Sequence, residues 1–382
     1  MFLRIKQLIY GTKNRSLRPL NDFIHPDITS LIGNTPIMEL QSLSKMTGCR
    51  ILAKLEFMNP GGSPKDRIAL RIMEDAEREG KLKPGLSTIC EGLSTICEGT
   101  VGSTGISLAM LAAYKKYGAY ICMPSDQAKE KSDILEAYGA IVERVKPASI
   151  VDDEMFVRRA QNKARELKNG FFVDQFENES NFNAHYEETG PEIWEQCGGD
   201  IDALVLGAGT GGTIAGVSRY LKEKKEDVKV FLVDPPGSGL FNKVKFGKKE
   251  DVKVFLVDPP GSGLFNKVKF GVMFAKEEAE GTRKRHQVDT IVEGVGINRI
   301  TRNFTEAIID ESFKITDDET IEMSRFLMKN EGLFVGSSSA INCVGAVKAA
   351  KELGPGHTIV TILCDSGQRH LTKFWRKDLQ PK

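Results

Sequence analysis

A lysine stands at a point of the chain where a positive charge is normally avoided. Lys65 follows the sequence Asn-Pro-Gly-Gly-Ser-Pro at 59–64, between a predicted strand and a predicted helix. The glycines let the backbone turn sharply and approach a ligand closely. Because the helix dipole disfavours a cation at the N-terminus, a lysine there indicates a charge that is used transiently, as in a Schiff base. The alternative is a surface lysine in an ordinary strand–helix turn.

Residues 207–213 have the composition of a phosphate-binding loop. Their sequence, Gly-Ala-Gly-Thr-Gly-Gly-Thr, follows a predicted strand and precedes a predicted helix. Backbone N–H groups at such a helix start bind phosphate. The glycines also fit the dinucleotide pattern G-x-G-x-x-G, and Asp234 follows at about the 20-residue spacing of a ribose-binding acid. The loop therefore predicts a phosphate site and leaves the carrier of the phosphate open.

Small and hydroxyl-bearing residues gather before two further predicted helices. They are Glu-Gly-Thr-Val-Gly-Ser-Thr-Gly at 98–105 and Gly-Ser-Ser-Ser-Ala at 336–340. Free N–H groups at a helix start bind a carboxylate or phosphate, although hydroxyls there also serve as ordinary N-caps. The sequence Asp-Gln-Phe at 174–176 adds an amide that would orient a ligand, or that is simply a satisfied structural group.

In this order, the motifs resemble those of the cysteine synthase and cystathionine β-synthase family, which are fold type II pyridoxal-phosphate enzymes. Ile-Gly-Asn-Thr-Pro at 32–36 resembles the opening signature of that family, and the resemblance runs from about Asp27 to Leu371. It is closest to the fungal cysteine synthase 2 branch. The stretches that resemble this branch are 146–152, 285–294, 364–367 and 369–371.

The resemblance implies a role for each motif. Lys65 would carry the cofactor covalently and then act as the base at the substrate Cα. Ser338 would hydrogen-bond the pyridine nitrogen, where a neutral hydroxyl favours elimination over transamination. Ser103 would face the 3′-oxygen of the cofactor. The cofactor phosphate would be held by Gly209, Thr210, Gly211, Gly212 and Thr213. The α-carboxylate of the substrate would be held by Thr100, Val101, Gly102, Thr104 and Gln175.

Three departures from the family pattern concern the substrate and the rate. The family usually has Asn where Ser103 stands and Ser where Val101 stands. Val101 removes a substrate hydrogen bond that is worth about 0.5–1.5 kcal/mol. The stretch 294–299 also lacks the aromatic residue and the proline that usually follow its glycines.

The implied reaction is a β-replacement that converts O-acetylserine and sulfide to cysteine. Its partners would be a small amino acid and sulfide or another thiol, with no metal ion, and the protein would be a homodimer. The alternatives are a serine or cysteine β-lyase or a cystathionine synthase, then a catalytically impaired paralogue. The pattern at 207–213 keeps an NAD(P)-dependent oxidoreductase open as a last alternative.

Alternating elements must position these motifs. Continuous apolar strands separated by helices predict an α/β fold with mostly parallel sheets flanked by helices. The resemblance implies two domains with the cofactor between them, a smaller substrate-side domain at 46–179 and a larger phosphate-side domain at 21–45 with 180–382. Predicted strands are 51–57, 119–123, 140–145, 203–206 and 358–364, and predicted helices are 66–79, 106–117, 127–138, 152–167 and 213–222.

Two tandem duplications interrupt this pattern. Residues 224–247 recur unchanged as 248–271, and residues 86–92 recur as 93–99. Each long copy holds one predicted strand, at 228–233 or 252–257. Because a sheet has one place for this strand, we expect one copy to bulge out or to add at an edge, and the protein to be destabilised. The short duplication directly precedes the carboxylate loop, where small displacements reduce catalytic rates.

Composition narrows the class of partner. A formal net charge of +1 gives no reason to expect nucleic acid or an anionic membrane surface as a partner, and no apolar run is long enough to span a membrane. The seven cysteines lack metal-site spacing, which predicts reduced thiols. The basic leader at 1–20 contains no acid and fits either a mitochondrial transit segment or a disordered leader. We therefore expect a mitochondrial location, with the cytoplasm as the alternative.

Overall fold

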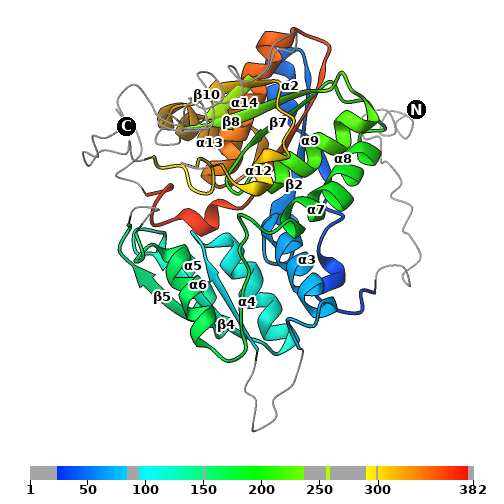
Figure 1. Cartoon of the computed structure of the whole chain (residues 1–382). Coiled ribbons are helices and arrows are strands. Elements are labelled where there is room, and N and C mark those ends of the chain that lie inside the picture. The colour runs from blue at the N-terminus through cyan, green and yellow to red at the C-terminus, as the bar shows by residue number, and fades with distance from the viewer. Residues whose placement is uncertain are drawn as a thin grey trace, which may run out of the picture.

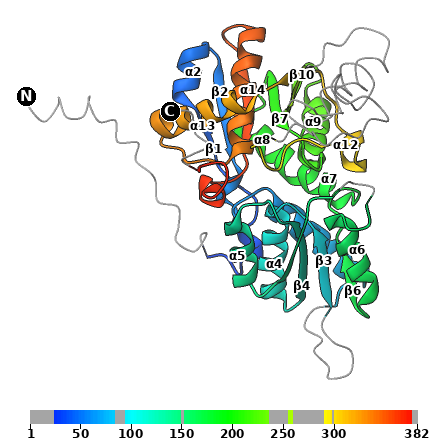
Figure 2. The same ribbon diagram turned by 90° about the vertical axis from the view of Figure 1, so that its left-hand side faces the viewer.

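The computed structural model describes residues 24–83, 94–148, 152–235, 255–258, 290–297 and 300–376. These residues form two sheets, each covered by helices on both faces, one above the other in the views of Figures 1 and 2. The predicted α/β class with mostly parallel sheets is confirmed.

The larger sheet has a buried, largely parallel centre. In spatial order its strands are β1 (Ile37–Glu39), β2 (Arg50–Leu55), β11 (Thr358–Leu363), β7 (Ala203–Gly207), β8 (Lys229–Asp234), β10 (Glu311–Lys314) and β9 (Phe255–Asp258). Strand β1 runs antiparallel to β2, and the other neighbours are parallel. All six residues of β11 are buried, as expected for a strand covered on both faces.

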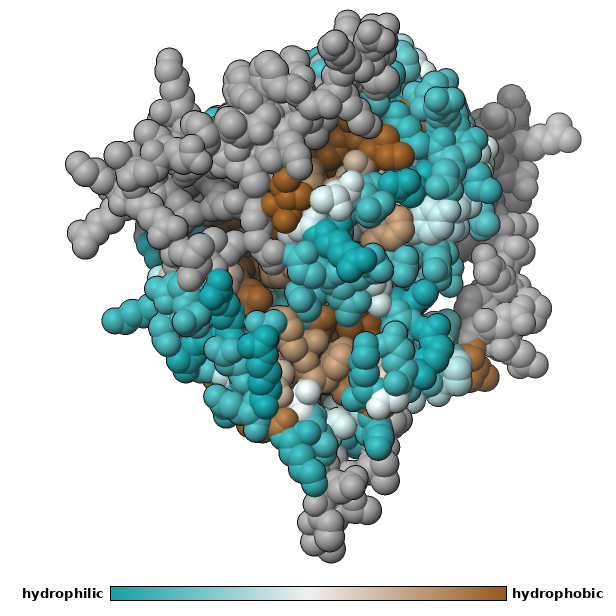
Figure 3. All heavy atoms as spheres, in the orientation of Figure 1, coloured by the Kyte–Doolittle hydropathy of each residue, from teal (hydrophilic) through white to brown (hydrophobic). Residues whose placement is uncertain are grey.

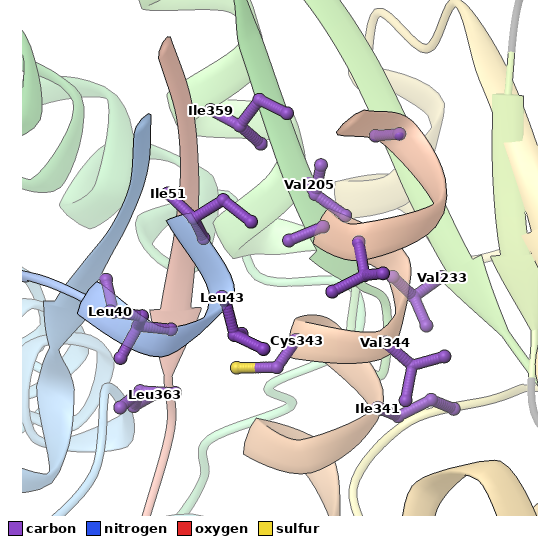
Figure 4. Packing of buried hydrophobic residues seen from close by; sticks show 14 of the residues in the cluster. Leu40, Leu43, Ile51, Val205, Val233, Ile341, Cys343, Val344, Ile359 and Leu363 are labelled. Atoms are coloured by element: carbon purple, nitrogen blue, oxygen red, sulfur yellow. The ribbon is translucent and has the colours of Figure 1, made fainter. Parts of the chain in front are cut away.

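Helices of the larger sheet form two hydrophobic layers. One layer contains α2 (Gln41–Thr47), α13 (Asp317–Glu331) and α14 (Ser337–Leu353). Figure 4 shows this layer, in which Leu43 and Ile341 join a cluster with Ile51, Val205 and Ile359 of the strands. The opposite layer contains α8 (Gly190–Gln196), α9 (Gly212–Lys224) and α12 (Arg302–Thr305).

The smaller sheet is parallel throughout. Its order is β5 (Ile141–Val145), β4 (Gly118–Pro124), β3 (Thr95–Gly99) and β6 (Gly170–Phe172). Helices α3 (Lys65–Arg78), α4 (Ser103–Lys115) and α5 (Lys129–Ala137) pack on one face. Helix α6 (Phe156–Glu166) packs on the other face, against Cys97 and Tyr120.

Short helical turns connect these layers. They are η2 (Thr29–Leu31), η3 (Glu56–Met58), α7 (Ser180–Ala184), the π-helical turn η4 (His185–Thr189) and η5 (Gly367–His370). On the face seen in Figure 3, the described surface is mostly hydrophilic, with hydrophobic patches near the middle of the molecule. Among the described helices, none combines the length and the apolar character needed to cross a bilayer.

The predicted elements match the observed ones apart from their ends. The strand expected at 51–57 stops at Leu55, because η3 begins at Glu56. The helix expected at 152–167 begins only at Phe156. Upstream of it, the Asp152 carboxylate accepts the N–H of Glu154, a local turn that competes with helix formation. The range 46–179 expected for the smaller domain includes β2, which pairs with β1 and β11 of the larger sheet.

Both copies of the long duplication pair with β10. Ser312 is the register partner of Leu232 in β8 and of the equivalent Leu256 in β9. The strand order places β8 inside the sheet and β9 at its edge, which confirms the expectation that one copy adds at an edge. Of the short duplication, the second copy supplies β3, and the first copy at 86–92 lies outside the described residues.

Candidate active site

Most of the chemically suggestive motifs follow the carboxyl ends of parallel strands, whereas the serine motif at 336–340 opens α14 after α13. The glycine loop follows β7, the carboxylate loop follows β3, Cys364 follows β11, and the lysine loop follows β2 and η3. This is the edge at which ligands bind in open α/β sheets. The Asn181 amide links two of the motifs, since it donates to the Gln175 carbonyl at 2.7 Å and to Thr210 Oγ1 at 2.9 Å.

Lys65 is the first residue of α3, as the sequence predicts for a lysine at a helix start. Within the described residues, its amine makes no hydrogen bond and no ion pair. Burial lowers the pKa of Lys65, and this effect outweighs the nearby Cys364, Asp365 and Glu56, which act in the opposite direction. The lowered pKa makes the neutral amine, which is the nucleophilic form, more accessible than in an exposed lysine.

The first turn of α3 is fixed by ion pairs and by a tight loop. The fully buried Arg67 guanidinium binds Glu56 at 2.8 Å and Glu192 at 2.6 Å. The Asp66 carboxylate accepts the N–H of Gly61, and burial raises the pKa of Asp66 to about 6. These contacts hold the backbone of Lys65 from both sides.

The glycine loop is closely packed around its backbone. A Cβ at Gly209 would lie 2.4 Å from the Gly294 carbonyl oxygen, and one at Gly212 would lie 2.0 Å from Asn181 Oδ1. Gly211 has a φ of +88°, which favours glycine. Helix α9 begins at Gly212, and the first N–H groups of a helix have no partner within it. The loop therefore offers backbone donors without side chains in front of them.

Thr213 is held from behind by a buried histidine. His185 Nε2 lies 3.0 Å from Thr213 Oγ1, and His185 Nδ1 lies 2.9 Å from Thr189 Oγ1. Burial and, to a lesser extent, the positive charge of Lys65 lower the pKa of His185 to about 3. A neutral imidazole thus orients one hydroxyl of the loop.

The carboxylate loop connects β3 to α4. The Thr100 hydroxyl accepts the N–H of Gly102 at 3.1 Å, and Gly102 has a φ of +135°. The Thr104 hydroxyl donates to Gln175 Oε1 at 2.5 Å. The Gln175 amide donates to Glu98 at 3.0 Å. Ser103 is the first residue of α4, so the predicted carboxylate-binding residues lie around one helix start.

Two buried ionisable side chains support this loop. Lys131 Nζ donates to the Val101 carbonyl at 3.4 Å and to Glu293 Oε2 at 2.6 Å. Burial raises the pKa of the Glu98 carboxyl to about 8, although the Gln175 amide opposes this shift. Lys131 was not predicted, because it stands in no glycine or hydroxyl motif. Glu98 opens the motif at 98–105, but the sequence assigned it no role.

Ser338 lies buried in the first turn of α14. Burial raises the pKa of the Cys364 thiol to about 12, and the Ser338 hydroxyl opposes this shift in part. Ser337 and Ser339 on either side serve other contacts, with the N–H of Glu293 and the N–H of Cys364. Sequence reasoning assigned Cys364 no separate role and grouped it with the reduced thiols. Its position directly after a strand and before a glycine turn is the signal that would have found it.

Comparison with known proteins identifies the family. Residues 28–365 match the family model described as pyridoxal-phosphate dependent enzyme. A relative from Schizosaccharomyces pombe named cysteine synthase 2 is 52% identical over 372 residues, covering 95% of this chain and 87% of the relative. A Saccharomyces cerevisiae relative, whose name includes the words mitochondrial cysteine synthase, is 49% identical and covers 92% of this chain and 84% of its own.

A solved structure agrees with these relatives. The chain is similar to a hydrogen sulfide-producing enzyme from Fusobacterium nucleatum, with a TM-score of 0.74 and 29% identity over 91% of this chain and 100% of that one. The predicted family, cofactor and fold type are confirmed, and the oxidoreductase alternative is not favoured. With a family match over nearly its whole described length, the chain belongs to the pyridoxal-phosphate dependent enzymes.

Proposed function

We propose that the chain is a cysteine synthase that converts O-acetylserine and sulfide to cysteine and acetate. The observation that carries this proposal is the arrangement around Lys65. An amine without a hydrogen-bond or ion-pair partner in the described residues lies at the same edge as a bare backbone cradle and a hydroxyl-rich helix start. Relatives of about half-identical sequence named cysteine synthase support the same reaction.

The residues present fit pyridoxal phosphate. The lowered pKa of Lys65 suits covalent attachment of an aldehyde. The glycine loop suits the phosphate, because α9 begins at Gly212 and the first N–H groups of a helix have no partner within it. The residues that would hold the phosphate are Gly209, Thr210, Gly211, Gly212 and Thr213. Ser338 would contact the ring nitrogen and Ser103 the 3′-oxygen. When bound, the cofactor supplies an electron sink for the carbanion at the substrate Cα.

The carboxylate loop would orient the amino-acid substrate. The Thr100 hydroxyl and the backbone N–H groups of Val101 and Thr104 would donate to the α-carboxylate, while Gly102 shapes the turn and Gln175 holds the Thr104 side chain. The Thr104–Gln175 and Gln175–Glu98 hydrogen bonds preorganise these groups before the substrate arrives. Val101 would contribute its backbone only, because its side chain has no donor.

Lys65 would move the proton at Cα. Its neutral amine removes that proton while the bond between Cβ and the acetate oxygen breaks. Sulfide then forms the bond to Cβ, and the Lys65 ammonium returns a proton to Cα. Acetate leaves with the electron pair of the broken bond, so that cysteine and acetate are the products.

The visible spectrum of the purified protein with added pyridoxal phosphate tests this proposal. We expect an absorption band that Lys65→Ala removes, that changes on addition of O-acetylserine, and that returns when sulfide is added and cysteine forms. A band that ignores O-acetylserine would contradict the proposal and favour the impaired paralogue. Cysteine formation from serine, or β-elimination without sulfide, would favour the lyase or cystathionine synthase alternatives.

We further propose a homodimer located in mitochondria and divided into a smaller substrate-side domain and a larger phosphate-side domain, with β2 added to the larger one. The name of the Saccharomyces cerevisiae relative and the acid-free basic leader support the location. Light scattering of the purified protein tests the dimer. Fractionation of cells that express the full chain, beside a chain without residues 1–20, tests the leader. Equal cytosolic amounts of both chains would overturn the mitochondrial assignment.

A further inference from the structure

A buried glutamate lies at the base of the carboxylate loop. Glu98 is the residue before the last of β3, and it is 0% exposed. Its Oε1 atom accepts a hydrogen bond from the Gln175 amide at 3.0 Å. Its Oε2 atom is buried and has no hydrogen-bond partner within the described residues. This carboxyl group therefore has fewer partners than a buried carboxylate normally needs.

The surroundings of Glu98 disfavour its ionised form. Because side chains alternate along a strand, Glu98 points away from Cys97 and α6, toward the layer of α3, α4 and α5. Burial raises the pKa of Glu98 to about 8, the Gln175 amide opposes this shift, and the charge of Asp174 reinforces it. The carboxyl group is therefore mainly neutral at pH 7.

Cations on the helices of this layer are paired with other carboxylates. Their partners are Glu56 for Arg67 of α3, Glu77 for Lys115 of α4 and Glu293 for Lys131 of α5. The Lys65 amine is influenced by other acidic groups, namely Cys364, Asp365 and Glu56. In the part of the chain that the structure describes, no cation pairs with Glu98 to stabilise a negative charge.

The Gln175 amide has one possible orientation. Its Nε2 atom lies 3.3 Å from the Gly99 carbonyl oxygen, which can only accept a hydrogen bond. Both amide protons are therefore engaged, one by Gly99 and one by Glu98 Oε1. The other end of the amide, Oε1, accepts the Thr104 hydroxyl at 2.5 Å. Hydrogen bonds thus connect Glu98 through Gln175 to Thr104, which lies in the first turn of α4.

We infer that Glu98 is a positioning residue, a neutral carboxylic acid that aligns Gln175 and Thr104 without placing a negative charge beside the α-carboxylate of the substrate. This inference rests on the proposed function. Glu98 stands two residues before Thr100, whose hydroxyl would donate to that carboxylate. A charge on Glu98 would repel the carboxylate in an interior that screens charges weakly. Ionisation of Glu98 should therefore weaken substrate binding.

Infrared spectroscopy of the purified full chain reports the proton on Glu98 without any turnover. A protonated carboxyl group and a carboxylate absorb at different frequencies. Subtracting the spectrum of Glu98→Gln from that of the wild type isolates this one group. We expect the protonated band at pH 7 and its loss at pH 10. Absence of the band at pH 7 would overturn the inference.

Steady-state kinetics with O-acetylserine and sulfide test the consequence for binding. At pH 7 we expect Glu98→Gln to match the KM of the wild type, because its amide keeps an acceptor for Gln175. At pH 9 the wild-type KM should exceed that of Glu98→Gln roughly 3–10-fold, as linkage predicts about one pH unit above the pKa, with kcat nearly equal. The ratio of the two removes titrations that both share, such as that of the substrate amine. Glu98→Ala should raise KM roughly 2–10-fold at both pH values, since Gln175 loses its partner.

Glu143→Gln is the matched control, because Glu143 belongs to β5 of the same sheet and pairs with Arg159 of α6. It should keep the wild-type pH profile. Parallel KM profiles of the wild type and Glu98→Gln from pH 7 to pH 9 would overturn the inference while the proposed function stands. A wild type that forms no cysteine would overturn the proposed function, and the infrared band would still decide whether Glu98 is neutral. If Glu98→Ala does not fold, Glu98→Gln against the wild type decides the question.

Discussion

Lys131 Nζ lies 2.6 Å from Glu293 Oε2, and both side chains are almost entirely buried. The pair joins α5, in the layer of the smaller sheet, to the segment 290–297, which packs on the larger sheet. Lys131 also contacts the Val101 carbonyl. One buried ion pair therefore connects the carboxylate loop to the part of the chain that holds the glycine loop.

Removing one partner of this pair should weaken both the fold and the site. We expect Lys131→Met to lower the free energy of unfolding by about 3–5 kcal/mol, because it leaves the Glu293 carboxylate buried beside fewer cations. The KM for the amino-acid substrate should rise, since Val101 loses its support. Chemical denaturation and steady-state kinetics measure the two effects.

The matched control is Lys129→Met on the same helix. Lys129 pairs with Asp133 in an exposed position, so its removal should change the free energy of unfolding by less than about 1 kcal/mol. In the double variant that carries both Lys131→Met and Glu293→Gln, the free energy of unfolding should fall by less than the sum of the decreases in the two single variants. Additive losses would show that the pair is not coupled.

His370 predicts a pH dependence of stability. Its ring nitrogens lie 2.9 Å from Glu293 Oε2 and 2.8 Å from Asp365 Oδ2. Burial opposes the charged form, but these carboxylates outweigh it and raise the pKa of His370 above its usual value. A raised pKa means that the charged ring stabilises the fold fully below about pH 6.5, and that this contribution fades as the pH rises through the folded-state pKa.

The comparison of wild type with His370→Gln should follow this pH window. We expect the difference in the free energy of unfolding to be about 1–3 kcal/mol at pH 6 and to shrink toward pH 9. Lys131 and Lys373 also face the carboxylates and reduce the effect without reversing it. His357→Gln, which removes a contact with the Gly354 carbonyl outside this cluster, is the matched control substitution. A difference that grows with pH would contradict the assignment.

The sequence predicted the elements and the motifs better than the contacts between them. Glycine spacing and helix-start chemistry located Lys65 and the loop at 207–213, because both depend on local backbone geometry. Lys131 and Glu293 are 162 residues apart, and nothing in the local pattern of either marks it as buried. The contact of Asn342 with Cys364 likewise forms only because α14 packs on β11. Long-range polar contacts were thus the part that sequence reasoning missed.

Replacing Val101 by the serine that the family usually has at this position should improve substrate binding. Val101 lies in the loop between β3 and α4, and its side chain cannot donate to a carboxylate. We expect Val101→Ser to lower the KM for O-acetylserine by roughly 2–10-fold, the range that one hydrogen bond gives. Steady-state kinetics measure this change. Val101→Ala should not lower the KM, and an equal improvement in both variants would assign the effect to size instead of hydrogen bonding.

The larger sheet needs only one copy of the duplicated strand, so we expect the second copy to lower stability. Leu232 and Leu256 are equivalent residues of the two copies and share Ser312 as register partner, but only β8 lies between two strands. Deleting residues 248–271 should therefore raise the melting temperature, because it removes 24 residues that must be accommodated at an edge. Deletion of 224–247 yields the identical chain, so the deletion cannot tell which copy the sheet uses.

Proline substitution separates the two copies. A proline removes a backbone N–H and fixes φ, so Leu232→Pro inside the sheet should cost about 3 kcal/mol or more and reduce the yield of folded protein. Leu256→Pro at the edge should leave the melting temperature unchanged or raise it. Thermal unfolding of the two variants beside the wild type measures this difference. If Leu256→Pro were the more damaging change, the second copy would be the one that the sheet requires, and β8 would not be the strand that lies inside it.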